Sequence, residues 1–184
     1  MNLVFVVGQC IWYILPAYVA NMAPLLAAMA MKDRFAVPLD FNRKLAGRPI
    51  LGTNKTYRGL IAGILGATLV SCLQTRLYAY PPVKSLSLLA YDKVNCAWWG
   101  FLMGFGALCG DAAKSFVKRR RDIPPGHSWR PFDQVDFLLG ALLFTSIVVV
   151  LPLSVIAGIL IVMPCIKIVV AHVGYWLGLR KTKW

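Results

Sequence analysis

Three aspartates stand at the ends of apolar segments, at positions where carboxylates could bind a metal ion. Asp133 and Asp136 lie three residues apart at the head of one apolar run, and Asp111 lies near the end of another. Lys114 or Ser115, and then Lys118, share a helical face with Asp111, and further bases follow: Arg119, Arg120 and Arg130. Mg²⁺ usually binds one or two carboxylates together with substrate phosphates. The pattern therefore predicts a metal-bridged phosphate site.

The pair Asp133 and Asp136 also has a purely structural explanation. An acid at a helix N-cap, with another three residues later, resembles a capping box, and Pro131 suits a helix start. Asp111 does not fit this explanation, because the helix dipole disfavours an anion near a C-terminal end. A cation must therefore compensate the charge of Asp111. This cation could be either a nearby lysine or a metal ion.

The chain offers little machinery for general base catalysis. It has no glutamate, and its two histidines are His127 and His172. No Ser-His-Asp arrangement can be assembled from these residues. A phosphate monoester is already ionised at neutral pH, so it needs no base, and positioning and charge neutralisation would then carry most of the rate.

A second polar segment, GRPILGTNKTYRG at residues 47–59, precedes another apolar run. Its glycine spacing matches a P-loop, but Thr53 stands where that motif requires lysine, and no strand precedes it. We therefore reject a P-loop. Asn54, Lys55 and Thr56 either bind a triphosphate or base, or form an ordinary turn and helix cap.

The composition indicates which elements position these residues. The 184-residue chain is 59% hydrophobic, more than a soluble domain of this size can bury, and its mean hydropathy is +0.66. We predict an all-α integral membrane protein in which residues 1–184 form one domain with a bundle of five transmembrane helices. The expected spans are 3–31, 58–76, 96–114, 134–151 and 155–178. Asn21 to Pro24 should kink or partly unwind the first span.

Glycines spaced four apart predict close helix packing at three places: Gly59 and Gly63, Gly100 and Gly104, and Gly106 and Gly110. The five cysteines stand singly in apolar segments, so we expect small buried side chains and no zinc or redox role. In the last span, Lys167 and His172 are ionisable, and Lys167 would either steer the phosphate group of a lipid into the predicted phosphate site or form an internal ion pair.

The distribution of charge predicts the orientation of the chain. Sixteen of the twenty lysines and arginines lie in residues 32–58, in residues 114–132 or in the last five residues. The positive-inside bias therefore places the loops 32–57 and 115–133 and the C-terminus in the cytoplasm, with the N-terminus outside. We interpret the first span as retained, not as a signal peptide. Part of the net charge of +13 would hold the protein against anionic membrane lipids, and we expect no nucleic-acid partner.

Several motifs together resemble the CDP-diacylglycerol synthase family. They are Gly110 and Asp111 followed by SFVKR, then a basic loop, then DxxD at the start of an apolar helix. The diacylglycerol enzymes have a longer loop with HGG and an Arg after the first Asp, whereas here His127-Ser128-Trp129 and Gln134 occur. DQVDF, the NKT loop and the ending GYWLGLRKTKW look more like the CDP-archaeol synthase branch.

This resemblance implies a Mg²⁺-dependent cell-membrane enzyme that converts CTP and a lipid phosphate to a CDP-lipid and pyrophosphate. It implies that Asp111, Asp133 and Asp136 hold the metal, with Lys118 among the catalytic residues. The implied substrate-binding residues are Asn54, Lys55, Thr56, Ser115, Arg119 and Arg120. Two lipid substrates remain open: unsaturated archaetidic acid, which is ether-linked, and phosphatidic acid, which is ester-linked. Three different functions also remain open: a lipid-phosphate phosphatase, a CDP-alcohol phosphotransferase, and a non-enzymatic small anion channel or assembly factor.

Overall fold

The protein is almost entirely helical, which confirms the predicted all-α class. The computed structural model describes residues 3–32, 34–124, 127, 129 and 132–176. Its elements are α1 (Leu3–Met31), β1 (Lys44–Leu45), β2 (Arg48–Pro49), α2 (Tyr57–Leu77), α3 (Pro81–Leu86), the 3-10 helix η1 (Tyr91–Lys93), α4 (Cys96–Arg120), α5 (Phe132–Thr145) and α6 (Leu153–Trp176).

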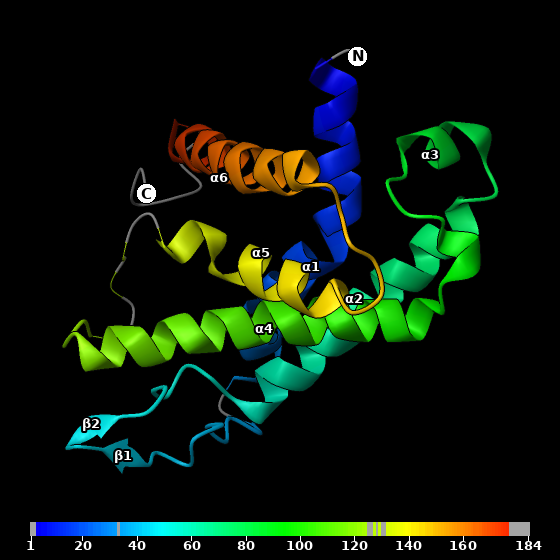
Figure 1. The fold of residues 1–184 in the computed structure, drawn as a ribbon. Helices are drawn as coiled ribbons and strands as arrows, with labels where there is room; N and C mark the ends of the chain where they lie inside the picture. The colour runs from blue at the N-terminus through cyan, green and yellow to red at the C-terminus, as the bar shows by residue number, and fades with distance from the viewer. Residues whose placement is uncertain (1–2, 33, 125–126, 128, 130–131, 177–184) are drawn as a thin grey trace.

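Helix α4 is the centre of the bundle and packs against α1, α2 and α5 (Figure 1). The glycine pairs make these contacts close, as predicted. A Cβ on Gly100 would lie 2.4 Å from the Thr68 Cα in α2. A Cβ on Gly110 would lie 2.1 Å from the backbone carbonyl oxygen of Asp136 in α5. Because these two glycines occupy different faces of α4, the helix approaches both neighbours backbone to backbone.

Helix α2 meets α1 in the same way. A Cβ on Gly63 would lie 2.8 Å from the Ala20 oxygen, and one on Gly59 would lie 3.0 Å from the Pro24 Cβ. Helix α1 continues through Asn21 and Pro24, so the partial unwinding expected there does not occur. Pro24 instead fills the space that Gly59 leaves open.

Two predicted helix boundaries need correction. Helix α4 continues to Arg120, six residues beyond the predicted end of its span, and carries the lysines and arginines that follow Asp111. Helix α5 begins at Phe132 but ends at Thr145, six residues before the predicted end. Its 14 residues extend about 21 Å, less than the roughly 30 Å of a bilayer core.

Large apolar side chains cover much of the outer surface of the bundle. On α2, Ile61, Leu65, Leu69 and Leu73 follow one another at four-residue spacing and are 56–72% exposed. Within the part of the chain that the structure describes, two helical segments, Val4–Met31 and Tyr57–Leu77, are long and apolar enough to cross a membrane, and Leu153–Ile166 is a shorter apolar helix. An exposed stripe of this kind is typical of a helix that contacts lipid.

A short β-hairpin, which the sequence did not predict, packs beside the end of α4 (Figure 1). Arg120 donates from Nη1 to the Leu45 oxygen at 2.6 Å and from Nη2 to the Arg48 oxygen at 3.1 Å. Arg48 donates in return to the Arg120 oxygen at 2.7 Å and to Asp122 at 2.6 Å. These reciprocal bonds fix the segment before α2 against α4.

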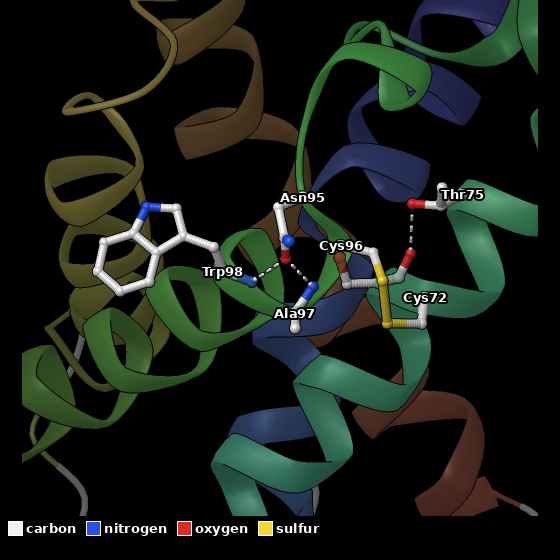
Figure 2. The surroundings of a disulfide bond; sticks show 7 residues. Cys72, Thr75, Asn95, Cys96, Ala97 and Trp98 are labelled. Atoms are coloured by element: carbon white, nitrogen blue, oxygen red, sulfur yellow. Dashed lines mark hydrogen bonds between the residues drawn. A yellow bond between two sulfur atoms is a disulfide. The ribbon is translucent and has the colours of Figure 1, made fainter.

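A disulfide joins Cys72 in α2 to Cys96, the first residue of α4 (Figure 2). The prediction that all five cysteines are small buried side chains is therefore wrong for this pair, and it is also wrong for Cys165, which is exposed. Cys72 and Cys96 lie close enough to form this bond because the glycine contacts bring α2 and α4 together. Of the free cysteines, Cys10 is buried, Cys109 half-buried and Cys165 exposed.

Candidate active site

The three predicted aspartates converge on one ammonium group, that of Lys114. Its Nζ lies 3.1 Å from Asp111 Oδ1, 3.1 Å from Asp133 Oδ1 and 2.6 Å from Asp136 Oδ2. Lys114 and Asp111 come from the last turns of α4, whereas Asp133 and Asp136 come from the start of α5. The close α4–α5 packing at Gly110 therefore brings the carboxylates together from two helices.

Two further lysines contact this cluster. Lys55, in the segment before α2, forms an ion pair with Asp111 Oδ2. Lys118, one turn after Lys114, lies 3.3 Å from Asp133 Oδ1 and also donates to the His127 oxygen. The cation required beside Asp111 is thus supplied by lysines in this structure.

Helix α5 begins at Phe132, so Asp133 is already its second residue and not its N-cap. Its Oδ2 accepts a hydrogen bond from the Trp129 amide, while its own amide donates to the Trp129 oxygen at 3.0 Å. Asp133 therefore ties the end of the loop to the helix and also faces the lysines. The simple capping-box explanation does not describe this arrangement.

These groups line a polar cavity of about 340 Å³, which we call the polar chamber. The loop before α2, the last turns of α4 and the start of α5 all contribute to it. Seven predicted site residues line it: Asn54, Lys55, Asp111, Ser115, Lys118, Arg119 and Asp133. The sequence therefore identified most of the chamber, although Lys114 was only a candidate for the cation beside Asp111 and was not among the predicted site residues.

Arg119 is the unusual member of the chamber because it is buried without a counter-ion. The residue is 7% exposed, and within the described part of the chain its Nε has no hydrogen-bond partner and its guanidinium has no ion pair. A buried cation normally requires a compensating acid, since desolvating a charge is costly. An anionic ligand would compensate it here, and planar guanidinium groups bind phosphate well.

The described side chains do not form a chelating metal site as they stand. Among residues 3–32, 34–124, 127, 129 and 132–176, no group of three or more His, Cys, Asp or Glu is arranged to hold a metal ion. The Lys114 ammonium lies among the three carboxylates instead. The donor set still fits a hard cation, because three carboxylates already surround one positive charge.

Three predicted site residues lie outside the polar chamber. Thr56 caps α2, where its Oγ1 accepts from the Gly59 amide at 3.2 Å, so this residue forms the predicted helix cap. Arg120 binds the hairpin carbonyls. Asp136 contacts the cluster through Lys114 but lines an adjoining apolar groove. Arg130 and the side chains of Lys167 and His172 lie outside the described parts of the structure.

Asp40 organises the loop beside the chamber, and no pattern in the sequence pointed to it. Its carboxylate accepts from the amides of Leu51 at 2.8 Å, Gly52 at 3.1 Å and Asn42 at 3.0 Å. Burial alone raises the pKa of a carboxyl group, but these three amides outweigh it and hold the pKa of Asp40 below its ordinary value. Gly52 has a φ of +96°, a conformation that glycine adopts without strain.

Comparison with known proteins identifies the family. The CarS-like family model, described as CDP-archaeol synthase, matches residues 1–184. The chain belongs to this family. It is 37% identical to the CDP-archaeol synthase of Pyrococcus furiosus over 177 residues, which cover 96% of this chain and 94% of that protein. It is also 37% identical to the Methanocaldococcus jannaschii enzyme of the same name over 182 residues, or 95% of each chain.

A solved structure has a similar fold. It is described as an intramembrane enzyme for archaeal membrane lipids biosynthesis, with a TM-score of 0.70 and 29% identity over 87% of this chain and 90% of that one. The predicted CTP-dependent cytidylyltransferase class and the predicted family are confirmed by these findings. Together with the apolar helices, they indicate a membrane protein.

Proposed function

We propose that the protein transfers CMP from CTP to 2,3-bis-O-geranylgeranylglycerol 1-phosphate (unsaturated archaetidic acid), giving a CDP-lipid and pyrophosphate. The observation that carries this proposal is the polar chamber, where uncompensated Arg119 lies close to the cluster of three carboxylates. Such a chamber offers binding groups both for phosphates and for the cation that accompanies them. Family membership and the names of the relatives support the choice of nucleotide and lipid.

The reaction needs no general base from the chain. An oxygen of the lipid phosphate attacks the α-phosphorus of CTP, the new P–O bond forms, and the bond to the β-phosphate oxygen breaks to release pyrophosphate. The lipid phosphate is ionised at neutral pH, so no proton must be removed from it. Arg119, Lys118 and Lys55 would bind phosphate oxygens and hold the reacting groups in line.

Asp111, Asp133 and Asp136 are the residues that would hold Mg²⁺. When bound, the ion would supply charge neutralisation for the triphosphate. Lys114 provides the comparable positive charge among these carboxylates in this structure. This proposal rests on the donor set and on the convergence of the three aspartates, not on an observed ion.

The first experiment measures product formation by the purified protein in detergent. Labelled CTP, Mg²⁺ and the ether-linked lipid phosphate should yield a CDP-lipid and pyrophosphate, and EDTA should abolish the reaction. The same assay with ester-linked phosphatidic acid compares the two lipid classes. Undiminished catalysis in EDTA would contradict the metal assignment, and absence of product with both lipids would refute the proposed function.

Neutral variants test the carboxylates separately. Asp133→Asn and Asp136→Asn should abolish turnover while the protein stays folded, whereas loss of a helix cap would cost only about 1 kcal/mol of stability and spare activity. Asp92→Asn is the matched control, because Asp92 is exposed in η1 and distant in sequence from the chamber. Active Asn variants at positions 133 and 136 would overturn their role as ligands.

We further propose five membrane spans, the fourth made of α5 together with the mostly apolar residues 146–151 that follow it, with the polar chamber facing the cytoplasm and the N-terminus outside. The basic loops support this orientation, and so does the disulfide. Cys96 lies fifteen residues before Asp111 on α4, about 22 Å along the helix, so the disulfide is remote from the chamber. Disulfides persist in oxidising surroundings such as the cell exterior.

Labelling of introduced cysteines tests this orientation in a background without the three free cysteines. A membrane-impermeant maleimide should label Lys84→Cys in intact cells and Arg121→Cys only after permeabilisation. The opposite pattern would invert the proposed topology.

A further inference from the structure

One wall of the polar chamber is a loop and not a helix. This loop precedes α2 and lines the chamber at four positions: Leu51, Gly52, Asn54 and Lys55. Helical hydrogen bonds do not fix its backbone, so other contacts must hold it in place. Lys55 depends most on such contacts, because its side chain must reach Asp111 on α4 from this loop.

Two backbone hydrogen bonds hold Lys55 within the loop. Its amide donates to the Gly52 oxygen at 3.3 Å, and its oxygen accepts from the Leu39 amide at 2.7 Å. Both partners adjoin Asp40, since Leu39 precedes it in the chain and the Gly52 amide donates to its Oδ2 at 3.1 Å. Asp40 is thus connected to the backbone of Lys55 through both hydrogen bonds.

Asp40 lies outside the polar chamber but accepts three backbone amides beside it. Leu51 and Gly52 both donate to Oδ2, and Asn42 donates to Oδ1. The residue is 7% exposed, so water competes little for these bonds. A carboxylate has enough lone pairs to accept all three donors, whereas a carboxamide has a single acceptor oxygen. The loop therefore requires a carboxylate at this position.

We propose that Asp40 is a positioning residue for the nucleotide: it fixes the backbone of residues 51–55, so that Asn54 and Lys55 line the polar chamber in the arrangement that binds phosphate. This inference rests on the proposed function, in which Lys55 binds a phosphate oxygen. Asp40 acts on the nucleotide only through the loop. A purely structural Asp40 would instead change the stability of the protein and leave its affinity for CTP unaltered.

Kinetics of Asp40→Asn test the proposal. In either orientation of the carboxamide, its NH₂ group faces at least one amide that now donates to Asp40, so at least one bond is lost. The KM for CTP should rise about tenfold or more, as expected for the loss of a charge-assisted hydrogen bond that orders the loop. The KM for the lipid phosphate should not change. Partial unfolding alone would lower kcat without raising the KM for CTP.

Asp122→Asn is the matched control for this variant. Asp122 forms an ion pair with Arg48 of the neighbouring hairpin, but its side chain is 67% exposed, and such a pair contributes little. The control should change neither KM. An unaltered KM for CTP in Asp40→Asn would overturn the proposal.

A second pair of variants leaves Asp40 intact, so the test does not depend on the folding of Asp40→Asn. Gly52 has a φ of +96° and Gly47, in the hairpin turn, a φ of +77°, so alanine is strained at both positions. Gly52 donates to Asp40, whereas a Cβ on Gly47 would meet nothing within 4 Å. Gly52→Ala should therefore raise the KM for CTP and Gly47→Ala should not. Equal KM values for the two variants would contradict the proposal.

Binding of labelled CTP in the absence of lipid separates this inference from the proposed function. Equilibrium dialysis with Mg²⁺ should give a dissociation constant about tenfold higher for Asp40→Asn than for the wild type. If this difference appears but the wild type forms no CDP-lipid, the proposed function is refuted and the positioning role stands. If the wild type forms CDP-lipid but binds CTP no more tightly than the variant, the positioning role is refuted and the function stands. A wild-type protein that binds no CTP would overturn both.

Discussion

Gly110 controls the distance between the two helices that carry the carboxylates, and Gly110→Ala should separate them. An added Cβ would lie 2.1 Å from the backbone carbonyl oxygen of Asp136, 3.0 Å from the carbon of the same carbonyl group and 3.1 Å from the Gly140 Cα. These are backbone atoms, so no side-chain rotation relieves the clash. Helix α5 must retreat by about 1 Å to restore an ordinary contact distance.

The expected cost has two parts. Overpacking of this kind destabilises by about 1–3 kcal/mol, while alanine in place of a helical glycine contributes about 0.5–1 kcal/mol in the opposite direction. A displacement of about 1 Å also moves Asp136 away from Lys114, which now lies 2.6 Å from it. Misplacement of that size at a site can reduce turnover about a hundredfold.

Gly158→Ala is the control that replaces a helical glycine by alanine without overpacking, so it measures the stabilising part of the effect alone. A Cβ at Gly158, within α6, would have only the Cys10 sulfur near it, at 3.9 Å. This control should be as stable and active as wild type, or slightly more stable. Thermal unfolding by circular dichroism and CDP-lipid formation are measured for both variants in the same detergent. If Gly110→Ala unfolds and turns over like the control, the close α4–α5 contact is not present and the reasoning is refuted.

Three other perturbations test separate parts of the structure. The pKa of Asp40 is lowered in the folded state, so Asp40→Asn should destabilise the protein at pH 7. The difference in melting temperature should begin to shrink as the pH falls below about 4, the ordinary pKa of aspartate, and should vanish only below the lowered pKa of Asp40 in the folded protein. A difference that does not shrink as the pH is lowered through this range would contradict the assignment. Arg119→Gln should raise the KM for CTP about tenfold or more, and it should not lower the melting temperature because it removes a buried charge without a counter-ion. The control Arg121→Gln, at an exposed position, should change neither the KM nor the melting temperature. The double variant Cys72→Ser/Cys96→Ser removes a cross-link between positions 24 residues apart and should lower the free energy of unfolding by about 3 kcal/mol. Added reductant should destabilise the wild type but not this variant.

Helices α1, α2 and α6 were predictable because each coincides with an apolar run. Residues 58–76 were expected as one span, and α2 occupies Tyr57–Leu77. Hydropathy failed at the end of α5, where residues 147–150 are all β-branched and Pro152 follows. Such residues are apolar enough for a span but poor helix formers, and the residue before a proline avoids the helical region. Apolarity alone therefore gave the wrong boundary.

The loop structure was not predictable because its contacts join residues far apart in sequence. The hairpin has strands of only two residues, too short for an alternating pattern. Asp40 binds amides eleven and twelve residues away, and Arg48 bonds to residues more than seventy positions later. These contacts depend on the end of α4 lying beside the loop, which no local pattern indicates.

For the site, the sequence identified the carboxylates but not the group that holds them together. Helical spacing placed Lys114 beside Asp111, yet nothing local showed that it would also contact Asp133 and Asp136 from the next helix. Three carboxylates this close would repel one another in the absence of a cation. Lys55, Lys114 and Lys118 balance them, so the cluster can form before any ligand binds.

This charge balance leaves Arg119 as the buried cation of the chamber that no acid compensates among the described residues. An entering triphosphate therefore meets a preformed positive charge instead of having to break an ion pair first. The three carboxylates that would hold Mg²⁺ are the same ones that pair with Lys114, so Lys114 would give up these ion pairs when the site holds an ion. Lys114 would then neutralise the carboxylates in the free protein and bind a phosphate oxygen in the complex, because the residue also lines the polar chamber.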